Sequence, residues 1–365
     1  MPLSVWLPLL VRNHCAVSPS RILQAVRMTV FSAFNSLLHG ADRLFYGRRV
    51  ARTPVPDNPL FILGHWRTGT TLLHELLALD GRMASPTTYQ CMAPHHFLLT
   101  EDVIPRLFRR LLPRRRPMDN VAVGFDRPQE DEFALCNLGA RSPYLRWMFP
   151  NRPCPWDNYL GLEGLSPEEE RRWGEALTGF VRRLAYRGRR RVVLKSPPHT
   201  ARVGQLMKLF PRAQFIHLVR DPYIVFPSTL YTWRRLWTSL GLQVPRFEGL
   251  EEYVLETFER MYRCFERDRH LLGRDNLYEM RYEDLVRDPV GEVRAMYRGL
   301  GLGDFAPVEP RLREYVSGAR DYRTNKFQLP QRLRDAIGQR WAGYIDRYGY
   351  ARPEAVPEAE PAGMR

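Results

Sequence analysis

A short loop near residue 65 carries residues suited to binding a phosphate. Residues 64–71 read Gly-His-Trp-Arg-Thr-Gly-Thr-Thr and lie between an apolar run, Leu60–Leu63, and a segment with leucines at helical spacing. Glycines let the backbone fold around an anion, and the free N–H groups at a helix start attract it. The loop is not a Walker A sequence, because Thr70 stands where that motif has lysine. Its cation, Arg67, can reach the side of the bound group where a leaving oxygen would develop charge.

Two later loops carry further cationic and hydroxyl residues. Lys195 and Ser196 come directly after one apolar run, Arg220 comes directly after another, and Ser228 lies further along the helical segment that follows. A strand-end arginine and a nearby hydroxyl can hold one phosphate from two sides, the arginine through two parallel N–H donors. Structural explanations stay open, a salt-bridged helix cap for Arg220 and space filling for Ser228.

The elements that must position these residues predict a parallel sheet. Each expected strand is short and apolar, and helical segments follow, which is the pattern of parallel strands covered by helices on both faces. Ligands of such sheets bind beyond the carboxyl ends of the strands, where all three loops lie. The predicted fold is therefore α/β, a three-layer, P-loop-like fold with a central parallel sheet. The expected strands are Leu60–Leu63, 191–194, Gln214–Val219 and Leu277–Arg281.

The chain is predicted to divide into three parts. Residues 1–58 form a helical region and a linker, residues 59–350 form the α/β domain, and residues 351–365, rich in Pro, Ala and Glu, form a disordered tail. Within the domain, residues 89–158 are a helical insertion at the ligand edge, where an acceptor pocket is expected. The insertion is rich in aromatic residues, which weakly favours a lipophilic acceptor.

The N-terminal region shows no membrane-spanning pattern. The apolar residues 5–11 are too few to cross a bilayer and lack the features of a signal peptide. Residues 22–38 carry apolar side chains at helical spacing, which predicts a helix packed on the core, with peripheral membrane contact as the alternative. The five cysteines are scattered without C-x-x-C spacing, which fits a reducing compartment. A cytoplasmic location is therefore expected.

Composition excludes disordered and collagen-like chains, since 44% of the residues are hydrophobic. The net charge of +15 indicates negatively charged partners, although only three of the 55 cationic residues are lysines, so arginine excess partly reflects base composition. Two alternatives follow, a P-loop phosphotransferase such as a small-molecule kinase and a non-enzymatic, basic polyanion-binding protein. Nucleic-acid binding is not expected, because it would not explain cationic residues at strand ends.

Taken together, these motifs resemble the sulfotransferases that use 3′-phosphoadenosine 5′-phosphosulfate (PAPS), especially the bacterial branch with an R-[ST]-G-T-T loop. The resemblance covers most of residues 60–350 and includes the separations among Lys195, Arg220 and Ser228. It also includes residues 280–286, Met-Arg-Tyr-Glu-Asp-Leu-Val, which are similar to the family's Y-E-D-L segment. The resemblance implies in-line transfer of a sulfuryl group from PAPS to a hydroxyl or amine of an unidentified acceptor. No metal is expected, because the acidic residues show no ligand spacing.

The resemblance also implies roles for individual residues. Arg220 and Ser228 would hold the 3′-phosphate, Tyr282 would lie by the adenine, and Lys195 would join Arg67 on the leaving-group side. The loop residues implied to hold the 5′-phosphosulfate are Arg67, Thr68, Gly69, Thr70 and Thr71. The family's C-terminal basic segment, which closes over the nucleotide, has its counterpart here in Arg323, Asn325 and Lys326.

Two positions depart from the family pattern. Leu72 replaces an aromatic residue that often stacks on adenine, and Pro197 replaces the histidine base of the cytosolic members. An acceptor hydroxyl still needs a proton acceptor. Among the carboxylates of the insertion we expect Glu130 to be that base. The alternatives that stay open are Asp131, Glu132, His95, His96 and His199.

Overall fold

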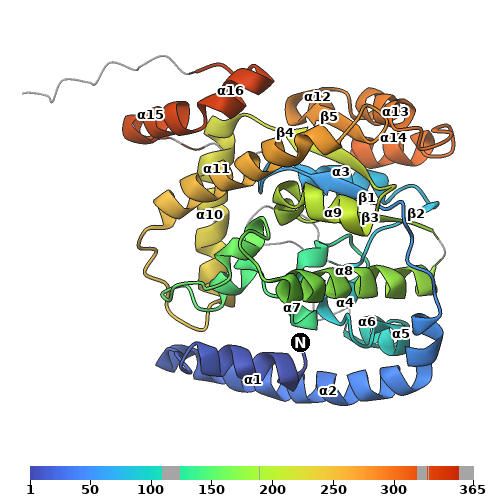
Figure 1. Ribbon diagram of the computed structural model, residues 1–365, viewed down its shortest axis with the longest axis vertical. Helices are drawn as coiled ribbons and strands as arrows, with labels where there is room; N and C mark the ends of the chain where they lie inside the picture. Colours follow the sequence, from blue (N-terminus) through green and yellow to red (C-terminus); the bar gives the residue numbers. More distant parts are fainter. Residues whose placement is uncertain (109–123, 189, 319–326, 328, 353–365) are drawn as a thin grey trace, which may run out of the picture.

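The computed structural model describes residues 1–352 except 109–123, 189, 319–326 and 328. Its centre is a five-stranded sheet in the order β2-β3-β1-β4-β5, in which every pair of neighbours is parallel (Figure 1). The strands are β1 Leu60–Leu63, β2 Met83–Ala84, β3 Arg191–Lys195, β4 Gln214–Val219 and β5 Leu277–Arg281. Nearly all of the predicted tail and the predicted C-terminal basic segment lie outside the described residues.

The α/β prediction is confirmed, and all four expected strands are present. β2 was not predicted, because two residues at the edge of a sheet give no periodic pattern. After β3 the chain forms a short 3-10 helix, η5 Pro197–Ala201, and then α9 Val203–Leu209.

Alternate residues of β1 face opposite sides of the sheet. Phe61 and Leu63 belong to one hydrophobic cluster and Leu60 and Ile62 to the other, and all four are fully buried. The first side packs on α8 Pro167–Arg187, α9, α10 Pro222–Leu240 and α11 Leu250–Asp268. The second side packs on α3 Thr70–Leu77, α13 Pro289–Gly299 and α14 Glu309–Gly318. The sheet is thus the middle of three layers, with its carboxyl edge left for the loops.

The insertion lies between the sheet and the N-terminal helices (Figure 1). Most of its aromatic residues are buried in the larger hydrophobic cluster. Its short helices are α4 Thr88–Met92, α5 Phe97–Thr100, α6 Ile104–Phe108, α7 Asp131–Leu138, η3 Pro143–Trp147 and η4 Asp157–Leu160.

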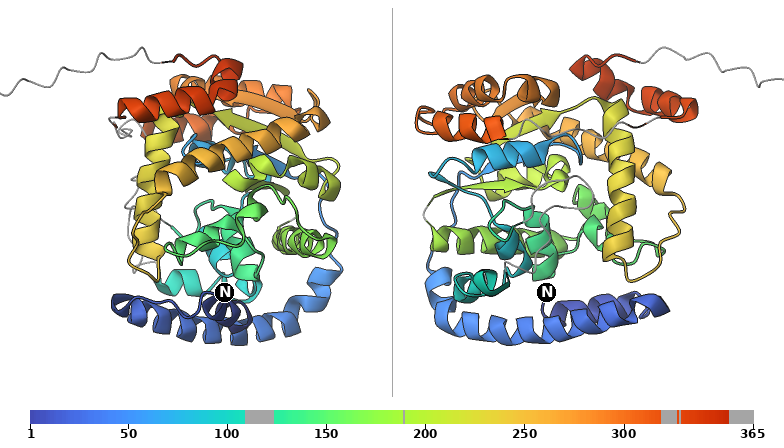
Figure 2. Two further views of the ribbon diagram at one scale, coloured as in Figure 1. Left: turned by 60° about the vertical axis from the view of Figure 1, so that its left-hand side comes forward. Right: turned by 180° about the vertical axis from the view of Figure 1, so that it is seen from behind.

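The N-terminal region is helical, as expected, and only part of the apolar surface of its long helix packs on the core. It contains α1 Leu3–Arg12, η1 Pro19–Arg21 and α2 Ile22–Ala51, which lie along one edge of the molecule, opposite α15 Gln331–Arg340 and α16 Ala342–Tyr348 (Figures 1 and 2). Ala25, Met28, Tyr46 and Val50 of α2 pack on the larger hydrophobic cluster, but most of its large apolar side chains are exposed, because polar side chains share its inner face. Within the described residues, no helix combines the length and apolar character needed to cross a bilayer.

Candidate active site

The loop between β1 and α3 has a backbone conformation that requires glycine at two positions. Gly64 and Gly69 have φ of +143° and +96°, in the left-handed region that favours glycine. A Cβ on Gly64 would lie 2.6 Å from the Leu218 carbonyl oxygen, and a Cβ on Gly69 would lie 2.2 Å from the Tyr282 ring. The two glycines therefore let the loop sit close to β4 and to the start of α12 Tyr282–Arg287.

The structure brings Arg220 and Ser228 to this loop. The Arg220 Nη1 donates to the Arg67 carbonyl oxygen at 2.8 Å, and the Arg67 Nε donates to the Ser228 Oγ at 3.0 Å. Arg220 comes directly after β4, and Ser228 lies on α10, so three elements converge on one place. The side chain of Arg67 is directed toward Ser228, which was not anticipated when it was grouped with Lys195.

Tyr282 lies on the other side of Arg220. The Arg220 guanidinium carbon is 4.1 Å from the centre of the Tyr282 ring, a cation–π arrangement. Leu72, the departure from the family pattern, is partly buried and packs against the same hydrophobic cluster as Tyr282. The site residues expected around a nucleotide are therefore gathered at the carboxyl edge of β1, β4 and β5.

Lys195 lies at the end of β3 and forms an ion pair with Glu130. The Lys195 Nζ is 2.7 Å from the Glu130 Oε1 and 3.4 Å from the Thr71 Oγ1 of α3. The side chains of Lys195 and Glu130 are 4% and 16% exposed, so the pair is largely shielded from water. This pair joins the insertion to the phosphate loop.

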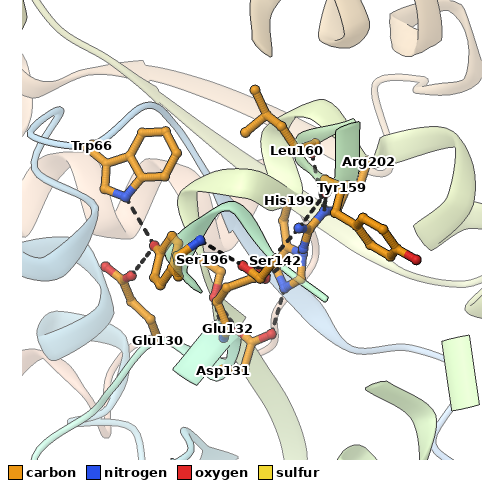
Figure 3. Close-up of polar contacts among 11 residues, drawn as sticks. Trp66, Glu130, Asp131, Glu132, Ser142, Tyr159, Leu160, Ser196, His199 and Arg202 are labelled. Carbon is orange, nitrogen blue, oxygen red and sulfur yellow. Dashed lines mark hydrogen bonds and ion pairs between the residues drawn. The ribbon is translucent and has the colours of Figure 1, made fainter. Parts of the chain in front are cut away.

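The second oxygen of Glu130 accepts a hydrogen bond from Tyr144. The hydroxyl of Tyr144 in turn accepts one from the Trp66 indole at 3.0 Å, so Trp66, Tyr144 and Glu130 form a chain (Figure 3). Burial and the neighbouring Glu130 charge raise the pKa of Tyr144 well above its usual value. Tyr144 therefore stays protonated and fixes the carboxylate. Sequence reasoning missed this contact, because Tyr144 is one aromatic among many in the insertion.

Asp131 and Glu132 are both fully buried and bonded to other side chains of the interior. Asp131 is fully buried, bonded to the His199 Nε2 at 2.7 Å and to the Ser196 hydroxyl at 2.9 Å (Figure 3). Burial acts to raise the pKa of Asp131, but the His199 charge and these hydrogen bonds outweigh it, so the pKa is lowered. Glu132 is fully buried and receives two bonds from Arg202, at 2.6 and 2.9 Å.

The paired histidines of the insertion also have structural partners. The His95 Nε2 faces the Asn137 carbonyl oxygen at 2.9 Å, and the His96 Nε2 faces the Asn35 Oδ1 of α2 at 3.0 Å. Burial lowers the pKa of His95 to about 3 and that of His96 to about 4. The His199 ring contacts Asp131 through its Nε2.

Three expected site residues, Arg323, Asn325 and Lys326, lie outside the described residues. Pro197, the other departure from the family pattern, is the first residue of η5. Among residues 1–352 that the structure describes, no group of three or more His, Cys, Asp or Glu side chains is arranged to hold a metal ion.

Comparison with known proteins points to one family. Residues 59–307 match the model of the family described as "Sulfotransferase family". Two curated relatives, from Mycobacterium bovis and Mycobacterium tuberculosis, are each called omega-hydroxy-beta-dihydromenaquinone-9 sulfotransferase Stf3. Each is 47% identical over 362 residues, which is 99% of this chain and 92% of the relative.

Solved structures agree on the fold. The sulfotransferase STF9 from Mycobacterium avium superposes with a TM-score of 0.71 at 22% identity, covering 92% of this chain and 87% of that one. STF1 from Mycobacterium tuberculosis H37Rv gives a TM-score of 0.62 at 19% identity, covering 93% and 91%.

Proposed function

The chain belongs to the sulfotransferase family and is a sulfotransferase, and we propose that it takes its sulfuryl group from PAPS and passes it to a lipophilic alcohol. The observation that carries the donor proposal is the meeting of two anion-binding groups at one sheet edge. The loop that contains Arg67 supplies one, and Arg220 with Ser228 supplies the other. Because Arg220 and Arg67 are hydrogen-bonded, a single nucleotide with phosphates at both ends can contact both.

The family assignment replaces the alternatives of a phosphotransferase and a polyanion-binding protein. In the proposed complex, the loop residues Thr68 to Thr71 hold the 5′-phosphosulfate through their backbone N–H groups. Arg220 and Ser228 hold the 3′-phosphate, and Tyr282 lies by the adenine. Arg67 spans the two anions, since its side chain already contacts Ser228. Arg323, Asn325 and Lys326 remain proposed nucleotide contacts.

Glu130 is the proposed proton acceptor. The acceptor oxygen attacks sulfur, the S–O bond to the departing phosphate breaks, and the hydroxyl proton passes to the Glu130 carboxylate. Lys195 contacts both Glu130 and Thr71, so it can stabilise the negative charge that develops on the leaving phosphate oxygen. Tyr144 keeps the carboxylate oriented toward the incoming hydroxyl, which reduces the cost of positioning it.

The proposed acceptor is a polyprenyl alcohol such as an ω-hydroxylated menaquinone. The curated relatives are named for an ω-hydroxylated dihydromenaquinone, and their sequences match almost the whole of this chain. The Tyr144 ring that bonds to Glu130 belongs to an aromatic cluster, since it stacks on Trp147 with ring centres 4.1 Å apart and Phe133 packs edge-on against it. Such a wall favours an apolar molecule over a sugar.

We also propose the domain division expected from the sequence. The family match begins at residue 59, which supports residues 1–58 as a separate N-terminal region. The catalytic domain then spans residues 59–350 with its insertion at about 89–158, and residues 351–365 form a tail.

Two measurements test this function. In a thermal-shift titration without magnesium, adenosine 3′,5′-bisphosphate should stabilise the enzyme, and adenosine 5′-phosphate should do so much less. Transfer of labelled sulfuryl groups from PAPS should then proceed to an ω-hydroxylated menaquinone and not to the same molecule lacking the hydroxyl. No stabilisation by the bisphosphate would overturn the donor. Transfer to sugars or amines but not to polyprenyl alcohols would overturn the acceptor.

A further inference from the structure

The helix α2 exposes most of its large apolar side chains. Its inner face is mixed: Ala25, Met28, Tyr46 and Val50 pack on the larger hydrophobic cluster. Polar side chains on the same face bond to other parts of the chain: Ser36 accepts from the Leu3 N–H, Thr29 accepts from the Trp6 indole, and Asn35 faces His96. Ser32 and Asp42 on this face are buried, and Asp42 pairs with Arg183 at 2.7 Å. A helix at the surface of a water-soluble domain normally buries its apolar side instead.

The outer face of α2 is apolar and exposed. Its residues recur every three or four positions, as one face of a helix requires. They are Leu23, Val26, Val30, Phe34, Leu37 and Leu44, each at least half exposed and up to 81% exposed at Leu44. The neighbouring α1 adds the exposed Leu7 and Val11. Such a row of large apolar side chains indicates a surface that is covered by something other than water.

The charges around this face are almost all positive. Residues 1–52 contain seven arginines and one carboxylate, and that carboxylate is Asp42, which is buried against Arg183. Arg27, Arg43, Arg48 and Arg49 of α2 are exposed. A second copy of the chain on this face would bring arginines together without carboxylates to pair them. A surface rich in anionic lipid headgroups would complement both the apolar row and the arginines.

We propose that α2, assisted by α1, lies in the interface of a membrane that contains anionic lipids. The helix rests parallel to the bilayer, with Phe34 and Leu37 among the acyl chains and the arginines at the headgroups. It rests on α2 itself and holds whatever the acceptor proves to be.

The proposal also connects the membrane to the catalytic domain. The inner face of α2 contacts the segment before α5 through Asn35 and His96, and contacts α8 through Asp42 and Arg183. In Figure 2, α2 runs along the bottom of the molecule, directly below the insertion. A lipid-dissolved acceptor would therefore be presented to the side of the enzyme that carries its acceptor-binding insertion.

The test is co-sedimentation with vesicles of phosphatidylcholine alone and vesicles in which a third of the lipid is phosphatidylglycerol. The wild-type chain should bind the anionic vesicles more tightly, and added salt should weaken that binding. The triple variant Phe34→Ser/Leu37→Ser/Leu44→Ser should lower the partition coefficient at least about tenfold, because three apolar side chains no longer enter the interface. Arg27→Gln/Arg48→Gln should lower binding to anionic vesicles only.

A control removes three exposed apolar side chains that lie elsewhere on the surface. Val244→Ser/Leu271→Ser/Val286→Ser should leave vesicle binding unchanged. The urea unfolding midpoint checks that each variant is folded, and this check does not depend on the donor assignment. Wild-type protein that stays in solution with both kinds of vesicle would overturn the proposal. Equal losses of vesicle binding in the triple variant and its control would also overturn it. So would a wild-type dimer that the α2 triple variant converts to monomers and the control variant does not.

Discussion

Replacing Arg220 with alanine should remove recognition of the 3′-phosphate while leaving the rest of the nucleotide bound. Arg220 is 9% exposed, lies over the Tyr282 ring and reaches the backbone of the phosphate loop, so its charge is little screened by water. A hydrogen bond between charged partners contributes about 1.5–3 kcal/mol net, which corresponds to a roughly 10- to 100-fold change in dissociation constant.

Four dissociation constants isolate this contribution. Adenosine 3′,5′-bisphosphate and adenosine 5′-phosphate are each titrated into the wild type and into Arg220→Ala by calorimetry. We expect the bisphosphate to bind roughly 10- to 100-fold more weakly to the variant, and the monophosphate to change by less than about threefold. Arg220→Lys should recover part of the loss, because it keeps the charge but not the planar fork.

Arg281→Ala is the matched control. Arg281 ends β5, the strand beside β4, and its guanidinium carbon lies 4.4 Å from the centre of the Tyr350 ring. This variant loses an arginine stacked on a tyrosine at the same sheet edge, so binding of both nucleotides should be unchanged. Equal weakening of both nucleotides by Arg220→Ala would mean that the arginine only orders the loop. No weakening of either would refute its place in the site.

Three further predictions follow from the same geometry. Glu130→Gln should lower kcat roughly 100- to 1000-fold with little change in bisphosphate affinity. Glu132→Gln leaves the buried Arg202 without its carboxylate and should instead lower the free energy of unfolding by about 3–5 kcal/mol. Equal effects of the two variants on kcat and on stability would contradict these roles. Gly69→Ala should destabilise the protein more than Gly249→Ala, because both glycines have positive φ but only Gly69 faces a ring, Tyr282, where the Cβ would lie; equal midpoints in urea would refute this. Burial lowers the pKa of His65 and of His74 to about 3 from an ordinary 6.5, so the unfolded chain takes up protons first and stability should fall as the pH drops below about 6.5, by roughly 2 kcal/mol per histidine at pH 5. Urea unfolding at pH 7 and pH 5 checks the sign.

The strands and the phosphate loop were readable from local pattern. Apolar runs such as Leu60–Leu63 and Gln214–Val219 are buried on both faces, so burial leaves its mark on every residue and needs no distant partner to be recognised. Gly64 and Gly69 were likewise readable, since a loop that turns sharply into a helix needs residues that accept positive φ.

Local pattern did not predict which of the adjacent carboxylates is available as a base. Glu130, Asp131 and Glu132 are adjacent and chemically alike, and their separate fates come from partners far away in the chain. Lys195 pairs with Glu130, His199 with Asp131 and Arg202 with Glu132. Only packing of α7 against the end of β3 and against η5 distinguishes them.

The orientation of α2 could likewise not be predicted from the sequence alone. Its sequence determined that one face would be apolar, because side chains three and four residues apart share a side of a helix. Which face turns inward was decided by contacts of Asn35, Ser36 and Asp42 with residues of α1, the insertion and α8. Periodicity thus determines the elements and their faces. Hydrogen-bonding partners that meet only in the folded chain determine which face is buried and which carboxylate stays available for chemistry.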